Sequence, residues 1–282
     1  MLLSSVGSTL PRRSNRTTDA SSDRIILRAH RHLAFTMAYQ PIVDVVNSSV
    51  VGYEALVRGL HNEPASAVLG ANIGMTGERR FDQRCHHLAI QLAGDLGLLE
   101  TGASLFLNFR PVAGEPMAER LAAALDAAEQ SGFPLNRLVV EITESEPLDD
   151  PAAVQRVLSH YRARGLRSAI DDFGAGFSGL SLLAVFQPDL VKIDLALIRQ
   201  IHARRRSEII VRSMVRMCAD LNIQVIAEGV EQNREFETLQ LLGVQYMQGN
   251  LFAEPGFERL PVWPAAVDGP ARRATDRLTL VS

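Results

Sequence analysis

Polar side chains that can bind cations recur in this sequence at one kind of position, the end of a short apolar run. They are Glu54, Asn108, Glu141, Asp171 with Asp172, Lys192, Glu228 and Gln248. A strand that only filled a core would not repeatedly end in a charged residue, because removing an unpaired charge from water is costly. In a barrel of parallel strands the C-terminal ends of all strands lie on one face, where the active site is found. The pattern therefore predicts one oxygen-rich cluster with an amine, of the type that holds hard divalent cations.

These oxygens can be divided between two cation sites. The first would take its ligands from four strand ends, Glu54, Asn108, Glu141 and Asp171, with water completing the coordination. A bridging Asp171, together with Asp172 and Glu228, would form the second. Two such cations activate a water and stabilise both oxygens of an in-line phosphoryl displacement. At the next strand end, the Lys192 ammonium would hold the attacking hydroxide or the negative phosphate oxygens.

Each charged residue also has a simpler explanation, as a helix N-cap or an exposed loop residue. At any single position that explanation is competitive, above all at Asp172 and Asp194. It does not account for the whole set, because all members occupy equivalent strand ends.

Strand-like and helix-like segments alternate through the chain and would position this cluster. The expected strands are 35–44, 50–57, 103–109, 137–142, 167–171, 189–193, 223–228 and 244–248. The expected helices are 80–98, 116–132, 151–164, 178–185, 205–221 and 233–242. Such alternation is typical of a parallel sheet, but Asn47-Ser48-Ser49 joins the first two strands as a hairpin. We therefore expect an α/β fold, a TIM-like (β/α)₈ barrel with an antiparallel first strand.

Length and composition fit one large domain with tails. The chain has 282 residues, 46% of them hydrophobic, close to the about 250 residues of a (β/α)₈ barrel. We expect disordered tails over residues 1–24 and 264–282, around a domain of residues 25–263. A net charge of −3 provides no basic field for duplex nucleic acid. The chain has only two cysteines, far apart in sequence, which fits a reducing compartment. No apolar run approaches the roughly 18 residues of a membrane span. We therefore expect a soluble cytoplasmic protein without membrane insertion.

Two other motifs suggest different chemistry. Gly174, Gly176 and Gly179 satisfy G-x-G-x-x-G after a strand, and Asp194 lies where a ribose-binding acid would be sought. Two carboxylates directly before these glycines would repel a pyrophosphate, so we disfavour dinucleotide binding. The run Cys85-His86-His87 contains soft-metal ligands, but neighbours on a helix do not share a face. We expect packing and surface roles for that run.

The complete set of motifs resembles the EAL domain, a family of cyclic di-GMP phosphodiesterases of bacterial signalling. The resemblance rests first on Glu54-Ala55-Leu56 with the following Arg58. Further matching stretches are Gln40-Pro41-Ile42-Val43-Asp44, Asn108, Glu141-Ile142-Thr143-Glu144, Asp171-Asp172-Phe173-Gly174, Lys192-Ile193-Asp194, Glu228-Gly229-Val230-Glu231 and Gln248-Gly249. Their order and their places at strand ends make the resemblance specific. The Asp-Asp-Phe-Gly-Ala-Gly loop is similar to the family branch whose EAL domains are paired with blue-light sensors.

The resemblance implies hydrolysis of cyclic di-GMP to linear pGpG with two ions of Mg²⁺ or Mn²⁺, in a protein that commonly forms a homodimer. It implies metal ligands at Glu54, Asn108, Glu141, Asp171, Asp172 and Glu228. The implied catalytic residues are Lys192, which would bind or help deprotonate the water, Glu228, and Glu144, which would fix the loop 171–179. The implied substrate contacts are Gln40, Arg58, Asp194, Glu231 and Gln248. Since we expect no sensor domain before the barrel, regulation is expected through oligomerisation, expression level or a protein partner.

The loop departs from the commonest family pattern. Ala175, Phe177 and Gly179 stand where Thr, Tyr and Ser are common, and Gly59 stands where a Trp often follows the Arg. Three hydroxyls are therefore absent from the loop that would organise the second cation. This keeps open an alternative function, a weak or inactive EAL domain that acts as a cyclic di-GMP receptor or a protein-interaction module.

Overall fold

The computed structural model describes residues 34–72, 78–109, 116–144, 150–176 and 179–263. The tails expected at 1–24 and 264–282, and Phe177 in the loop, lie outside these residues. No helix in the described part of the chain is long and apolar enough to cross a membrane.

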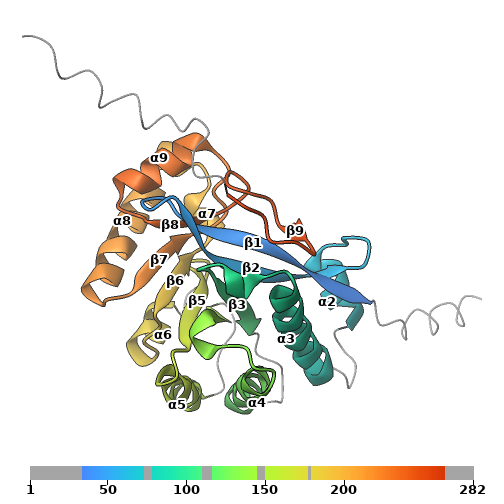
Figure 1. The fold of residues 1–282 in the computed structure, drawn as a ribbon. Coiled ribbons are helices and arrows are strands. Elements are labelled where there is room, and N and C mark those ends of the chain that lie inside the picture. The colour runs from blue at the N-terminus through green and yellow to red at the C-terminus, as the bar shows by residue number, and fades with distance from the viewer. Residues whose placement is uncertain (1–33, 73–77, 110–115, 145–149, 177–178, 264–282) are drawn as a thin grey trace, which may run out of the picture.

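Eight strands close into a barrel (Figure 1). They are β1 (Phe35–Asp44), β2 (Ser49–Gly59), β3 (Ser104–Phe109), β4 (Leu138–Thr143), β5 (Arg167–Phe173), β6 (Leu190–Ile193), β7 (Gln224–Ala227) and β8 (Tyr246–Gln248). Strand β1 pairs antiparallel with both β2 and β8, while the neighbours from β2 to β8 are parallel. A short strand, β9 (Gly256–Phe257), adds to β1. The predicted fold class, with its antiparallel first strand, is confirmed.

Helices surround the strands on the outside of the barrel (Figure 1). They are α2 (Ala65–Asn72), α3 (Glu78–Asp95), α4 (Met117–Gln130), α5 (Pro151–Arg162), α6 (Gly179–Val185), α7 (Leu195–Ile198), α8 (Arg205–Asp220) and α9 (Asn233–Leu241). Each expected strand and helix is present, with bounds within three residues of the prediction. Some short elements were not predicted, because segments this short carry little periodicity. They are α2, α7, β9 and the 3-10 turns at Leu98–Glu100, Leu135–Arg137 and Ile201–Ala203.

Helix α5 shows how local sequence fixes these elements. Asp150 caps its N-terminus by accepting a hydrogen bond from the Ala153 backbone amide at 2.8 Å, and Pro151 occupies the first turn. Val154, Leu158 and Tyr161 recur at helical spacing and are buried. This stripe packs the helix onto the barrel.

The inside of the barrel is filled by a dry apolar layer. Its members, all buried, are Ile42, Phe106, Val139, Ala169, Leu190 and Ile226. Gly52 makes room for one of them, since a Cβ there would lie 2.3 Å from Phe106 Cε2. Each fully buried Leu, Ile or Phe contributes about 1.5–3 kcal/mol. The layer separates the two open ends of the barrel, so groups at one end do not contact groups at the other.

Candidate active site

A fully buried lysine lies in the middle of the C-terminal end of the barrel. Lys192, on β6, is the only lysine in the sequence. Its Nζ lies 2.6 Å from Glu228 Oε1, 2.8 Å from Glu141 Oε1, 3.1 Å from Asp171 Oδ1 and 3.3 Å from Glu54 Oε2. These acids come from β2, β4 and β5 and from the residue that follows β7. The structure therefore brings four of the predicted carboxylates around one ammonium.

Three amide side chains join the same cluster. Asn108 donates through Nδ2 to Glu54 Oε1 at 2.8 Å, and Gln248 donates through Nε2 to Glu54 Oε2 at 2.6 Å. Gln248 also donates to Gln40 Oε1 at 3.2 Å. Because Asn108 uses its amide hydrogen on Glu54, its Oδ1 is the atom that can act as a ligand to a cation.

Asp172 reaches this site although it directly follows Asp171. Consecutive residues of a regular strand point to opposite faces. Here the pairing of β5 with β6 shifts register between Ile170 and Phe173, and Asp172 has a left-handed φ of 54°. Such irregularities re-aim side chains next to active sites. As a result, carboxylate oxygens of Asp171, Asp172 and Glu228 lie within 4.8 Å of one another.

Burial shifts the pKa of several groups in the cluster. It raises the pKa of Glu141 and of Glu228 well above the usual range, and the nearby Lys192 ammonium offsets only part of that effect. For Glu54, burial is outweighed by Lys192 and by hydrogen bonds from the two amides, so its pKa is lowered. The pKa of Lys192 is raised well above its usual value, because the surrounding carboxylates outweigh its burial.

A similar balance holds for Asp172. Burial, with added repulsion from Asp171 and Asp194, raises its pKa to about 6. Among the described residues, Glu141 Oε2 has no hydrogen-bond donor. Glu141 Oε1 and Asp171 Oδ1 are contacted by the Lys192 ammonium, at 2.8 Å and 3.1 Å, and by no other donor there. One ammonium cannot balance this concentration of buried negative charge. Carboxylate oxygens without donors are the ligands that hard divalent cations prefer, so the site fits such ions.

Glu144 connects β4 to the loop that follows β5. Its carboxylate accepts hydrogen bonds from the backbone amides of Gly174 at 2.6 Å and Gly179 at 2.9 Å. A Cβ at position 179 would lie 2.6 Å from Glu144 Cδ and 2.7 Å from Phe173 Cε2. Glycine at 179, where the family often has a serine, therefore lets the chain approach Glu144 closely.

Three predicted substrate contacts lie outside the lysine cluster. Arg58 is half-buried and donates a hydrogen bond to its neighbour's carbonyl, Val57 O, at 2.8 Å. Asp194 caps α7 by accepting from the Ala196 amide at 2.9 Å. Glu231 is exposed and pairs with Arg199 at 2.7 Å. Of the predicted substrate residues, Gln40 and Gln248 are therefore the ones that contact the cluster.

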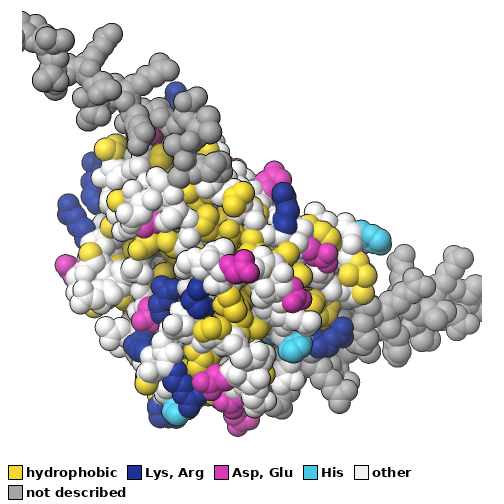
Figure 2. Space-filling model, viewed as in Figure 1, with side chains coloured by type: hydrophobic (Ala, Val, Ile, Leu, Met, Phe, Trp, Pro, Cys, Tyr) yellow, Lys and Arg dark blue, Asp and Glu magenta, His cyan; other side chains and the backbone are white. Residues whose placement is uncertain are grey.

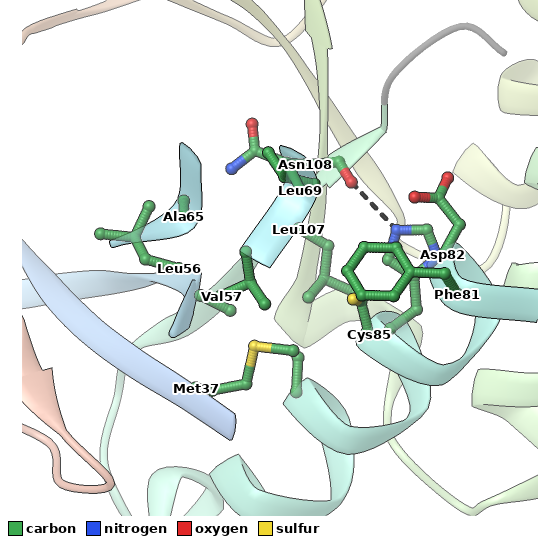
Figure 3. Close-up of a pocket in the computed structure, with 13 residues that line it drawn as sticks. Met37, Leu56, Val57, Ala65, Leu69, Phe81, Asp82, Cys85, Leu107 and Asn108 are labelled. Atoms are coloured by element: carbon green, nitrogen blue, oxygen red, sulfur yellow. Dashed lines mark hydrogen bonds between the residues drawn. The ribbon is translucent and has the colours of Figure 1, made fainter. Parts of the chain in front are cut away.

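One residue behind the site was assigned only a packing or surface role by the sequence analysis. His86, on α3, is buried and stacks on Phe109 with ring centroids 4.0 Å apart. Its Nε2 lies 2.9 Å from the carbonyl oxygen of Asn108 (Figure 3). Since a carbonyl only accepts, Nε2 must carry the hydrogen. The signal for this role is weak in sequence, since it consists only of Asp82 and His86 at i, i+4 on one helix face.

A cavity of about 90 Å³ lies beside His86, between β2, β3 and the helices α2 and α3. Figure 3 shows Met37, Val57, Leu107 and Phe81 around it, with Asn108 at its edge. These side chains belong to the apolar layer between sheet and helices. Because the cavity lacks the carboxylates described above, it is separate from the candidate active site.

Comparison with known proteins decides the family. A sequence model of the EAL domain matches residues 23–255. The chain belongs to the EAL domain family. The blue light- and temperature-regulated antirepressor BluF of Escherichia coli K12 is 32% identical over 230 residues, which cover 80% of this chain and 56% of BluF. The EAL resemblance is confirmed, and this chain spans about half the length of that relative.

Solved EAL structures agree with the fold. A standalone EAL protein from Vibrio cholerae O395, in its c-di-GMP-bound form, is 44% identical with a TM-score of 0.74, covering 82% of this chain and 97% of that one. Klebsiella pneumoniae BlrP1, in a complex with manganese and cyclic di-GMP, is 35% identical with a TM-score of 0.70, covering 83% of this chain and 59% of BlrP1.

Proposed function

We propose that this EAL protein hydrolyses one phosphodiester bond of cyclic di-GMP to linear pGpG with two divalent cations, Mg²⁺ or Mn²⁺. The observation that carries the proposal is the set of buried carboxylate oxygens that share one ammonium, Lys192, and find no other donor in the described part of the chain. Buried charge without a partner is costly, and a cation removes that cost. The Vibrio and Klebsiella proteins bind cyclic di-GMP, which supports the substrate class.

The cluster divides into two sets of ligands for the cations. Glu54, Asn108, Glu141 and Asp171 would hold one ion, and Asp171, Asp172 and Glu228 the other. When bound, the cations supply Lewis acidity for water activation and phosphoryl transfer. Asp171 suits the shared position, because the Lys192 ammonium is the only donor beside its Oδ1 among the described residues.

Lys192 and Glu228 have complementary roles in this proposal. The raised pKa of Lys192 keeps it an ammonium at neutral pH. That charge state favours holding the attacking water and a phosphate oxygen over deprotonating the water. Glu228, 2.6 Å from the ammonium and with a raised pKa, is suited to take the proton of the water. Glu144 would act through the loop by fixing the backbone amides of Gly174 and Gly179.

The substrate would contact groups around the cluster. Arg58 forms no ion pair in the part of the chain that the structure describes, and the nearby charge of Glu54 offsets only part of the burial that lowers its pKa, so its guanidinium suits a substrate phosphate. Gln40 and Gln248 offer amides next to Glu54. Asp194 and Glu231 already have partners and would have to exchange them, so their contacts with substrate stay predictions.

We further propose that residues 25–263 form the EAL domain and that the protein works as a homodimer. The observation in favour is apolar exposure beside the loop held by Glu144. Leu180, directly after that loop, is 65% exposed, and Leu195, at the start of α7, is 45% exposed. Burying such side chains against a second copy would remove them from water.

The test is to incubate the purified protein with cyclic di-GMP and Mg²⁺ or Mn²⁺ and to separate the products by chromatography. We expect metal-dependent pGpG that disappears with chelator and in Asp171→Asn. The matched control is Asp220→Asn, since Asp220 is exposed at the end of α8. Failure to form pGpG with either metal, while cyclic di-GMP still binds, would contradict the proposal.

The second candidate is a receptor or protein-interaction module. It is favoured by the altered loop and by the name of BluF, an antirepressor. An enzyme should lose its cellular output in Asp171→Asn, whereas the output of a receptor should persist in that variant.

A further inference from the structure

The opposite, N-terminal end of the barrel also carries a polar layer. Because side chains of a strand alternate between faces, residues two apart point into the barrel together. Three strands repeat one order along their inward face: Ser104, Phe106 and Asn108 on β3; Arg167, Ala169 and Asp171 on β5; Gln224, Ile226 and then Glu228 on β7. Each strand thus places one polar residue at the N-terminal mouth, one apolar residue in the middle and one predicted metal ligand at the far end.

The polar residues of this mouth surround a cavity of about 210 Å³. Its polar wall consists of Ser104, Arg167, Gln224 and Tyr246. Arg167 donates through Nη2 to Ser104 Oγ at 2.7 Å, and Gln224 donates through Nε2 to Tyr246 Oη at 3.2 Å. The apolar side of the cavity belongs to the dry layer described above, so the cavity does not open into the candidate active site.

The charge in this cavity is unbalanced. Arg167 is the only charged residue among those that line it. It makes no ion pair with any described residue, and its guanidinium donates one hydrogen bond, to Ser104. A guanidinium has five N–H donors and cannot lose its charge at accessible pH. Most of its hydrogen-bonding capacity, together with the Tyr246 hydroxyl, is therefore left for a ligand or for water.

We propose that the N-terminal mouth of the barrel binds a small oxyanion of the phosphate class, through Arg167, Ser104 and Tyr246. The planar donor fork of arginine matches phosphate oxygens. The volume is that of about seven waters at ~30 Å³ each, enough for one such anion with water. It is smaller than the about 300 Å³ at which pockets for larger organic ligands begin. A nucleotide is therefore not the expected occupant.

The site would act on the fold and not compete with substrate. Arg167 and Asp171, or Ser104 and Asn108, are four residues apart, which is about 13 Å along a strand. An anion held between β3 and β5 would brace the strands that carry predicted metal ligands at their other end. Binding would raise thermal stability without occupying the candidate active site.

The experiment uses the full chain in chelator, with inorganic phosphate compared against chloride at matched ionic strength. Chelator removes cations that would otherwise recruit phosphate to the carboxylates. Calorimetry at ten times the phosphate Kd should show Tm raised by about 3–6 °C. Equilibrium dialysis with radiolabelled phosphate should show one anion per chain. Arg167→Gln, which keeps a donor for Ser104, should lose both effects.

Three further variants make the result specific. Gln224→Glu changes an exposed residue and places a carboxylate beside Arg167, so it should abolish phosphate binding even if Arg167→Gln does not fold. Arg216→Gln removes an exposed arginine of α8 and should leave the phosphate effect unchanged, whereas Arg58→Gln tests whether phosphate binds at the active-site end instead. Equal effects of phosphate and chloride, or loss of phosphate binding in Arg58→Gln but not in the mouth variants, would overturn the proposal. The experiment requires no turnover, so its outcome is independent of the proposed phosphodiesterase activity.

Discussion

Replacing Lys192 by methionine is the perturbation with the largest consequence that the structure predicts. The variant keeps the length and packing of the side chain but removes the ammonium that lies 2.6–3.3 Å from four carboxylates. Breaking a buried ion pair from one side typically costs about 3–5 kcal/mol, because the remaining charge loses its partner. For a chain of this size, that loss corresponds to a fall in Tm of roughly 6–20 °C.

The dependence on pH and Mg²⁺ identifies the cause of this loss. Glu141 and Glu228 have raised pKa values with Lys192 present, and removing the ammonium raises them further. An acid with a raised pKa stabilises the fold below its unfolded pKa, and that stabilisation is lost as pH rises through the folded pKa. The cost of Lys192→Met should therefore grow as pH rises from about 5 to 8. Mg²⁺ should restore part of the stability by neutralising the same carboxylates.

The assay is urea denaturation in chelator and in Mg²⁺, at several pH values. Arg58→Met serves as the control, because Arg58 is half-buried and forms no ion pair among the described residues, its interaction with Glu54 being longer-range than those of Lys192. A surface ion pair contributes at most about 1 kcal/mol. If Lys192→Met lowers the free energy of unfolding by less than this, and the decrease does not change with pH or Mg²⁺, the reasoning is refuted. Since Lys192 is the only lysine, ¹⁵N-labelled lysine gives one Nζ signal for its pKa. That pKa should lie above its usual value in chelator and fall on addition of Mg²⁺.

Three more predictions test other parts of the site. The pKa of Asp172 is raised from 3.8 to about 6. In chelator, the wild type should therefore lose stability relative to Asp172→Asn as pH rises from about 4 through 6. Urea denaturation measures this, and parallel pH profiles of the two proteins would contradict it. Glu144→Ala leaves two backbone amides without their acceptor and should cost about 2–6 kcal/mol while weakening Mg²⁺ binding. Calorimetric Mg²⁺ titration checks that variant, and unchanged affinity would argue against a role for the loop. Leu180→Glu should shift the protein to monomer in sedimentation velocity, if the exposed leucine lies in a homodimer contact; an unchanged sedimentation coefficient would remove this face from the interface.

The barrel was predictable because two kinds of signal agree along the chain. Apolar runs of strand length alternate with amphipathic helices, and each run ends in a polar or charged side chain that needs water or a cation as a partner. A parallel barrel is the arrangement that gathers such ends on one face. The cluster around Lys192 therefore follows from the order of residues along the chain, before any distance between its members is known.

Other features depend on geometry that sequence patterns do not encode. Alternation along a strand places Asp172 away from Asp171, and only the register shift in β5 with the left-handed φ turns it toward the site. The contact between His86 and the carbonyl of Asn108 joins residues 22 positions apart through packing of α3 on β3. Short elements such as α7, whose N-terminus is capped locally by Asp194, have too few residues for a periodic signal.

The choice of lysine at position 192 itself carries information about the site. Apart from this residue, all of the 29 lysines and arginines in the chain are arginine. An arginine presents a planar fork that suits one or two carboxylates in its own plane, and it never loses its proton. Lys192 instead places a compact charge at one atom, Nζ, with carboxylate oxygens from four different parts of the barrel within 3.3 Å. A guanidinium could not occupy that point without displacing at least one of them. When cations bind, this charge must share its carboxylates with them and give up some of its own contacts. An ammonium on a flexible side chain is better suited to that than a guanidinium.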